Sequence, residues 1–215
     1  MALTVPPPRA PLDGGQALAR WYEHELGWAT SAGPPVQLVT GLRFDVLELP
    51  ATAGRGVLRR MGAAVGPVAL MGRRMRLLVA AGSAEELPGL LDWLEWGGIS
   101  LDLAMLGTDG RMTAPVPPGW RPTGRSASGA PGASVWLRAP EPGREVESSL
   151  PALRPPRGGA DAPCLARLVA AAAAECHRAR LLSAARVHRP EAGGEGDRSA
   201  AAAQRQLTAQ RFASS

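Results

Sequence analysis

The sequence predicts an α+β fold, in which a mixed or antiparallel sheet packs with helices and a further helix follows at the C-terminal end. Three observations lead to this prediction. Short aliphatic runs bounded by Gly and Pro are typical of strands, amphipathic runs of helical period lie between some of them, and the two kinds lack regular βαβ alternation. Hydrophobic residues make up 45% of the 215 residues, enough for one packed core.

The first predicted element is a helix that follows a Pro-rich arm. Residues 1–12 lack periodicity, so we expect the arm to be flexible. Apolar side chains at helical spacing predict a helix over 15–26, with Asp13 as its N-cap and Gly27 at its end.

The next segments predict two strands, a helix and a hairpin. Strand-like runs occupy 34–41 and 43–50, and apolar residues on one side of 51–64 predict a helix. Residues 66–82 contain two aliphatic runs separated by Gly72-Arg73-Arg74, which predicts a hairpin.

A third helix is predicted to begin at Ser83, from the residues of its first turn. Ser83 and Glu86 have the spacing of a capping box, in which each side chain satisfies a backbone N–H of the first turn. Strands are predicted at 99–106 and 111–118, on either side of a Gly-flanked turn over 107–110.

The last third of the chain contains one more predicted strand, at 133–140, and the longest helix. The helix has Leu165, Val169, Ala172 and Cys176 on one face, which predicts docking on the domain. The predicted organisation is a flexible arm (1–12), an α+β domain (13–150), a linker (151–162), a C-terminal helix (163–188) and a disordered tail (189–215).

The composition bears on whether the chain binds nucleic acid, spans a membrane or is secreted. The formal net charge is +5, yet all 24 basic residues are Arg, and the absence of Lys and Asn is typical of a high-G+C, bacterial genome. The arginines therefore count little as an indication of nucleic-acid binding. No apolar run reaches the roughly 18 residues of a membrane span, and the N-terminus lacks the pattern of a secretory signal. We expect a cytoplasmic protein without a membrane partner.

The order of several segments resembles a known family over roughly residues 15–140. The segments are the Gly27-Trp28 pair after the first helix, "VTGLRFDVLELP" at 39–50, "GRRMRLLV" at 72–79, "LDLAMLGTDGRMTAPVPP" at 101–118 and "SVWLRAP" at 134–140. This order is similar to that of the N-terminal domain of bifunctional primase–polymerases, a branch of the archaeo-eukaryotic primase-like superfamily.

The resemblance implies nucleotidyl transfer by two metal ions, Mg²⁺ or Mn²⁺, and it also shows where this chain departs from the family. The family's Asp-x-Asp pair falls on Glu48 and Pro50, and its phosphate-holding His falls on Met75. Asp102 matches the third acid. With one of four positions retained, the resemblance implies a degenerate member that does not polymerise and needs no cofactor.

Asp45 is a further candidate for a remnant metal site, beside Glu48 and Asp102. It lies three residues before Glu48, so the two side chains point to opposite sides of a regular strand. The alternative interpretation is that these acids lie at strand edges, where they pair with Arg43 or Arg76 or are solvated.

Two groups of arginines are candidates for binding nucleic acid or nucleotide. Arg73, Arg74 and Arg76 surround the hairpin turn, where guanidinium groups can hold phosphates in bidentate contacts. Arg167 and Arg178 lie on the side of the C-terminal helix opposite its apolar stripe. The alternatives are an ordinary basic turn and a solvated helix face.

The tryptophans and cysteines are further candidates for binding or catalysis, but their spacing favours structural roles. Trp93 and Trp96, like Trp21 and Trp28, can stack on bases, but the helical spacing of Trp93 and Leu90 favours core packing. Cys164 and Cys176 lie about 18 Å apart along a helix, too far for a disulfide, and no spacing typical of a zinc site occurs.

The function expected from the sequence is a catalytically degenerate primase–polymerase-like domain that acts as a binding or regulatory module for nucleic acid or nucleotide, with weak affinity. Two alternatives remain open. One is an active primase or polymerase that uses Asp45, Glu48 and Asp102 with Mg²⁺ or Mn²⁺. The other is a protein-interaction module that works through the C-terminal helix.

Overall fold

A computed structural model describes residues 14–31, 33–120, 133–143, 145–153 and 163–187. The chain divides into two compact units, Met1–Arg178 and Ala179–Ser215, which we describe separately. The expected arm, the Asp13 cap, most of the expected linker and the tail lie outside the described residues.

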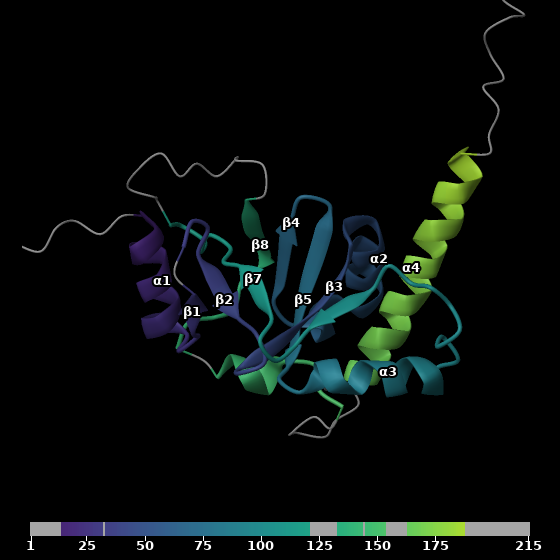
Figure 1. Ribbon diagram of the computed structural model, residues 1–215, viewed down its shortest axis with the longest axis horizontal. Coiled ribbons are helices and arrows are strands. Elements are labelled where there is room, and N and C mark those ends of the chain that lie inside the picture. The colour runs from purple at the N-terminus through teal and green to yellow at the C-terminus, as the bar shows by residue number, and fades with distance from the viewer. Residues whose placement is uncertain (1–13, 32, 121–132, 144, 154–162, 188–215) are drawn as a thin grey trace, which may run out of the picture. The chain divides into compact units, whose positions relative to one another are not determined.

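The first unit contains a five-stranded antiparallel sheet, which confirms the predicted α+β class (Figure 1). Its strand order is β6 (Ala104–Leu106), β3 (Phe44–Pro50), β5 (Arg74–Ala80), β4 (Val68–Met71) and β8 (Ser134–Arg138). The hairpin prediction is confirmed, because β4 and β5 pair across a turn in which Gly72 adopts φ +56°.

The strand predicted over 99–106 is shorter than expected, since β6 begins at Ala104. It pairs with β3 up to Glu48, and β3 ends two residues later at Pro50. Pro50 has no N–H to extend a ladder, and the chain enters a helix at the next residue. In this register Pro50 stands opposite position 102, so no partner strand remains for residues 99–101.

A second, three-stranded antiparallel sheet consists of β1 (Thr30–Ser31), β2 (Gln37–Val39) and β7 (Arg111–Thr113), and α1 (Gly14–Glu25) packs beside it. The phenolic O–H of Tyr22 in α1 donates to the carbonyl of Pro115 at 2.6 Å, and the indole N–H of Trp136 donates to the Tyr22 oxygen at 2.8 Å. A core cluster joins this part to one side of the large sheet through Tyr22, Leu26, Trp28, Val36, Leu38, Phe44, Val46, Ala69, Leu78, Met112, Ala114, Val146 and Leu150.

Helices cover the other side of the large sheet, where β3 and β5 present fully buried aliphatic side chains (Figure 1). They are α2 (Ala51–Met61), followed by a 3₁₀ turn over Gly62–Val65, and α3 (Ser83–Trp93). The approach of α2 is close, because a Cβ added to Gly54 would collide with Met75 of β5.

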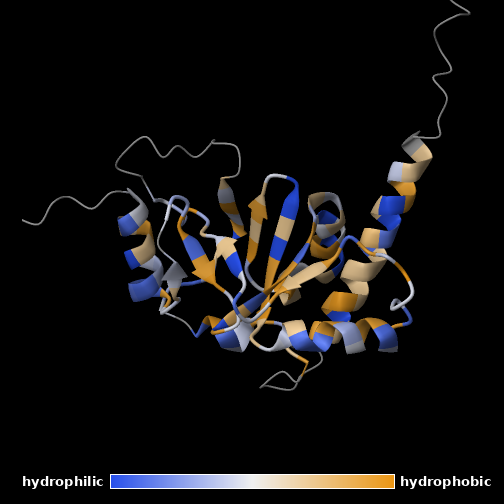
Figure 2. Cartoon of the chain, viewed as in Figure 1, coloured by the Kyte–Doolittle hydropathy of each residue, from blue (hydrophilic) through white to orange (hydrophobic). Residues whose placement is uncertain are grey.

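The last helix, α4 (Leu165–Val187), confirms the predicted apolar stripe. Leu165, Val169, Ala172 and Cys176 are all buried in the first unit, and Figure 2 shows the corresponding hydrophobic colouring of that part of the helix. Among the described residues, neither α4 nor any other helix combines the length and the hydropathy that a membrane span requires.

The start of α3 differs from the prediction. Ser83 and Glu86 do not form a capping box, because the N-cap residue is Gly82, in a left-handed conformation. Glycine has no side chain that could accept a hydrogen bond from the backbone N–H groups of the first turn. Instead, the carboxylate of Asp45 accepts the backbone N–H of Ala84 at 2.9 Å. A buried acid from a distant strand takes the place that sequence reasoning gave to a local cap.

Candidate functional site

The two acids of β3 lie on opposite sides of the sheet, as their spacing predicts. Residues directly paired in an antiparallel ladder lie on the same side. Glu48 pairs with Arg76 on the side of the sheet that carries the core cluster, whereas Asp45 pairs with Val79 on the side that α2 and α3 cover.

Asp45 has a structural position. It is fully buried and accepts the N–H of Ala84, while its other carboxylate oxygen has no hydrogen-bond partner among the described residues. Burial raises the pKa of Asp45, and the nearby charge of Glu85 raises it further, against the lowering effect of the helix N–H groups. The expectation that Asp45 pairs with Arg43 or is solvated is wrong, since Arg43 pairs with Glu147 at 3.0 Å.

Glu48 holds two arginines of β5. The Nε–H of Arg74 donates to Oε1 of Glu48 at 3.0 Å, and the Nε–H of Arg76 donates to Oε2 at 2.7 Å. The side chain of Arg76 is 10% exposed and that of Arg74 is 28% exposed. Because both ion pairs are partly shielded from water, they hold the guanidinium groups more firmly than fully exposed pairs would.

Asp102 joins this group from the chain leading into β6. The Nη1–H of Arg74 donates to Oδ1 of Asp102 at 2.6 Å, and the Asp102 side chain is 66% exposed. We call Glu48, Arg74, Arg76 and Asp102 the Arg–Glu site. The thiol of Cys176 in α4 donates to the backbone carbonyl of Asp102 at 3.5 Å, and burial raises the pKa of Cys176 to about 12.

Met75 and Pro50, which stand where the resemblance expects a His and an Asp, contribute nothing to this site. Met75 is fully buried on the opposite side of the sheet, against Gly54 of α2. Pro50 is the last residue of β3 and precedes α2.

The donor set does not fit a two-metal centre. Two hard cations require at least two carboxylates that can share them. Asp45 lies on the other side of the sheet, both oxygens of Glu48 accept from arginines, and Arg74 holds Asp102. Within the described residues, no group of three or more His, Cys, Asp and Glu side chains could hold a metal ion.

The two predicted groups of arginines belong to different elements. Arg73 is exposed in the β4–β5 turn beside Arg74, and Figure 2 shows the hydrophilic bands that cross β5. Arg167 and Arg178 are exposed residues of α4.

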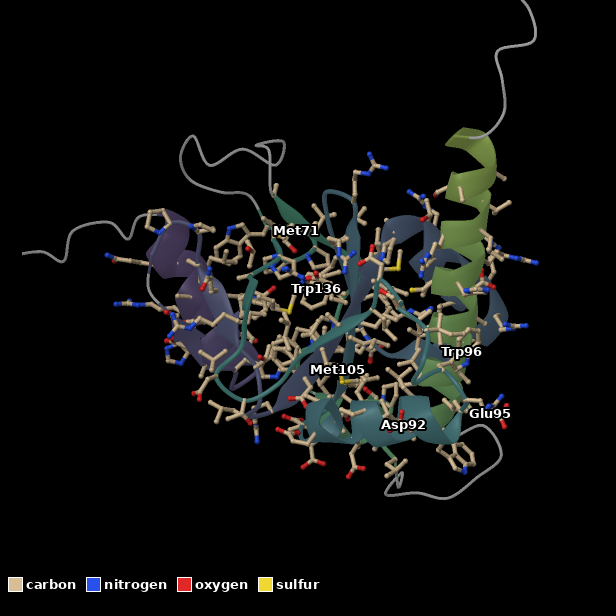
Figure 3. All side chains as sticks on the ribbon, turned by 45° about the vertical axis from the view of Figure 1, so that its right-hand side comes forward. Met71, Asp92, Glu95, Trp96, Met105 and Trp136 are labelled. Carbon is tan, nitrogen blue, oxygen red and sulfur yellow. The ribbon has the colours of Figure 1, made fainter. Side chains whose placement is uncertain are left out.

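The tryptophans follow the core prediction in part. Trp28 is buried and Trp21 packs against the core cluster, and Trp96 contacts His177 of α4 with ring centroids 5.6 Å apart (Figure 3). Trp93, however, is 72% exposed, so its predicted core packing is wrong. The buried stripe of α3 passes through Ser83, Leu87 and Leu90, and helical spacing continues it to Leu94 instead.

Sequence reasoning missed two residues beside the Arg–Glu site. The Nη1–H of Arg76 donates to the sulfur of Met71 at 3.5 Å. Met71 pairs with Arg74 on one side and with Ser134 on the other, and the buried Ser134 hydroxyl has no hydrogen-bond partner among the described residues. The hairpin register could have placed Met71 there, but no local signal places Ser134, because β4 and β8 are far apart in the sequence.

No protein-family model, no curated protein and no solved structure matches this chain.

Proposed function

We propose that this chain is a non-catalytic binding module, a primase–polymerase-like domain without the catalytic set, whose Arg–Glu site and neighbouring Arg73 bind phosphate groups of nucleic acid or nucleotide. The observation that carries the proposal is the clamp of Glu48 on Arg74 and Arg76, which holds two guanidinium groups beside each other at one end of the sheet.

Pre-positioned guanidinium groups suit phosphate recognition. An arginine has five N–H donors, and the contacts to Glu48 and Asp102 use two of those of Arg74. Because the carboxylates already restrict the side-chain rotamers, a ligand phosphate binds with a smaller entropic cost. With Arg73 included, the three arginines exceed the two acids by one positive charge, so the affinity is expected to be weak and sensitive to salt.

The same contacts argue against catalysis. Glu48 and Asp102 serve as partners of arginine, and a metal ion would have to displace a guanidinium group to reach either acid. Loss of the arginine contacts would lower the free energy of unfolding by more than loss of an exposed ion pair would, since Arg76 is largely buried. No cofactor therefore enters the proposal.

The experiment is a titration of a fluorescently labelled single-stranded DNA with the full chain, followed by anisotropy at several salt concentrations, with a nucleoside triphosphate as competitor. The double variant Arg73→Ala/Arg74→Ala is expected to weaken binding and to reduce the slope of log K against log salt by about 1.4, which is about 0.7 for each lost phosphate contact on a single strand.

A matched control separates this site from general charge. The double variant Arg20→Ala/Arg59→Ala removes the same charge from exposed positions on α1 and α2. It should change affinity less than the hairpin variant. Equal losses for the two variants, or salt-insensitive binding, would show that the Arg–Glu site is not the ligand site.

A further inference from the structure

The C-terminal half of α3 contradicts the local rules of helix stability at several exposed positions. Pro88 lies inside the helix, and Gly89 follows it at an exposed position where an added Cβ would meet nothing within 4 Å. Gly and Pro both destabilise a helix interior, and no close contact at Gly89 requires a glycine there. They leave a bare strip of backbone between Glu86 and Trp93, both of which are exposed.

The C-terminal end of α3 also holds a residue that is unfavourable at its position. The N–H of Trp96 bonds to the carbonyl of Leu91, and the N–H of Glu95 bonds to that of Asp92, which is the Schellman pattern. The left-handed position of this motif normally belongs to Gly, but here it holds Glu95, at φ +64°. A negative charge at a helix C-terminus is also unfavourable, because of the helix dipole. Figure 3 shows Asp92 and Glu95 on this end of the helix.

These features form one surface, the α3 surface, made of Glu86, Gly89, Asp92, Trp93 and Glu95. All five residues are exposed, and Trp93 is 72% exposed. The helix and its C-terminal turn, residues 83–96, contain four carboxylates and no arginine. An aromatic side chain amid acids suits a partner that brings both an apolar group and positive charge.

The second unit of the chain has that chemistry. Its described part is the helical segment over 179–187, in which Leu181 and Leu182 are each 57% exposed. Together with exposed Ala185 they form a leucine stripe on one helix face. The unit contains six arginines against three acids, so its charge is opposite to that of the α3 surface.

We propose that the α3 surface of one copy binds the leucine stripe of a second copy, so that the chain associates head to tail. The apolar contact is between the leucines and Trp93 over the bare Gly89 strip, and the acids of the α3 surface attract the basic unit. This contact joins two different surfaces, so it generates rings or open chains and not a two-fold dimer. It is independent of the phosphate-binding proposal.

The test is sedimentation velocity of the full chain over a range of protein concentrations. The wild-type chain is expected to associate, and Trp93→Ala and the double variant Leu181→Ala/Leu182→Ala are each expected to weaken association by about tenfold or more. Association should also weaken as salt rises, because opposite charges contribute. Leu42→Ala, at another exposed leucine, is the matched control and should behave as wild type.

Mixing the two variants tests the head-to-tail geometry. The Trp93→Ala chain retains its leucine stripe, and the Leu181→Ala/Leu182→Ala chain retains its α3 surface, so a mixture should form a complex of one copy of each and stop there. A wild-type chain that stays monomeric, variants that associate as strongly as wild type, or a mixture that does not associate would each overturn the proposal.

Discussion

The carboxylate of Asp45 in β3 accepts a hydrogen bond from the backbone N–H of Ala84 in the first turn of α3, across 39 residues of sequence. The contact ties the central strand to a helix that lacks a local side-chain cap. It also accounts for an acid in the covered side of the sheet, where a charge is otherwise costly. Asp45 is therefore a structural residue, and Glu48, on the other side of the sheet, is separate from it.

Asp45→Asn is expected to change the pH dependence of stability. Burial raises the pKa of Asp45, so the folded chain holds this proton to a higher pH than the unfolded chain does. The stability that protonated Asp45 contributes is full below its unfolded pKa and is lost as the pH rises through its folded pKa. The Asn variant should thus match wild type at low pH and melt at a higher temperature at neutral pH.

The control for this comparison is Asp45→Ala, which removes the acceptor for Ala84. It should lower the melting temperature at low pH by the equivalent of about 1 kcal/mol, the usual value of a helix cap, and this deficit should shrink as the pH rises through the folded pKa of Asp45, because alanine does not titrate. Parallel pH profiles for wild type and Asp45→Asn would contradict the assignment.

A polymerase assay is expected to give no product. Glu48 and Asp102 are held by arginines, and Met75 faces the helices, so neither Mg²⁺ nor Mn²⁺ should support primer synthesis or extension. Incorporation of nucleotides on a template, measured on denaturing gels, checks this. Activity that disappears in Asp102→Ala would contradict the proposed function.

Tyr22→Phe should destabilise the chain by about 1–3 kcal/mol, because it leaves the carbonyl of Pro115 and the indole N–H of Trp136 without their shared partner. Chemical denaturation measures the loss. Tyr22→Phe combined with Trp136→Phe should cost less than the sum of the two single variants, since one hydrogen bond is counted in both. Strict additivity would show that the Tyr22–Trp136 contact contributes no free energy.

Cys176 should resist alkylation in the folded chain. Its pKa is raised to about 12, first by burial and then by the charge of Asp102, and the thiolate is the reactive form. Cys164 is partly exposed and should react with iodoacetamide under native conditions. Mass spectrometry of Cys164→Ser and Cys176→Ser chains distinguishes the two thiols. Rapid labelling of Cys176 without denaturant would show that this part of α4 does not stay packed.

The sequence by itself determined the elements whose signals are local. The aliphatic run of β3, the turn at Gly72 and the apolar stripe of α4 all appear in the structure, because strand propensity, backbone freedom and helical spacing act over a few residues. The alternation of side chains along a strand, which is also a local rule, placed Asp45 and Glu48 on opposite sides of β3. The tertiary structure decided which side is buried and which partners those two acids find.

Contacts between distant segments could not be predicted in this way. The capping box at Ser83 and Glu86 is replaced by Asp45, and Trp93 is exposed because the buried stripe of α3 is set by the sheet beneath it. Glu48 acquires its two arginines only when β3 pairs with β5 in one particular register. Sequence pattern specifies the side to which a residue points, whereas its partner depends on long-range strand pairing and helix packing, for which a single sequence carries no local signal.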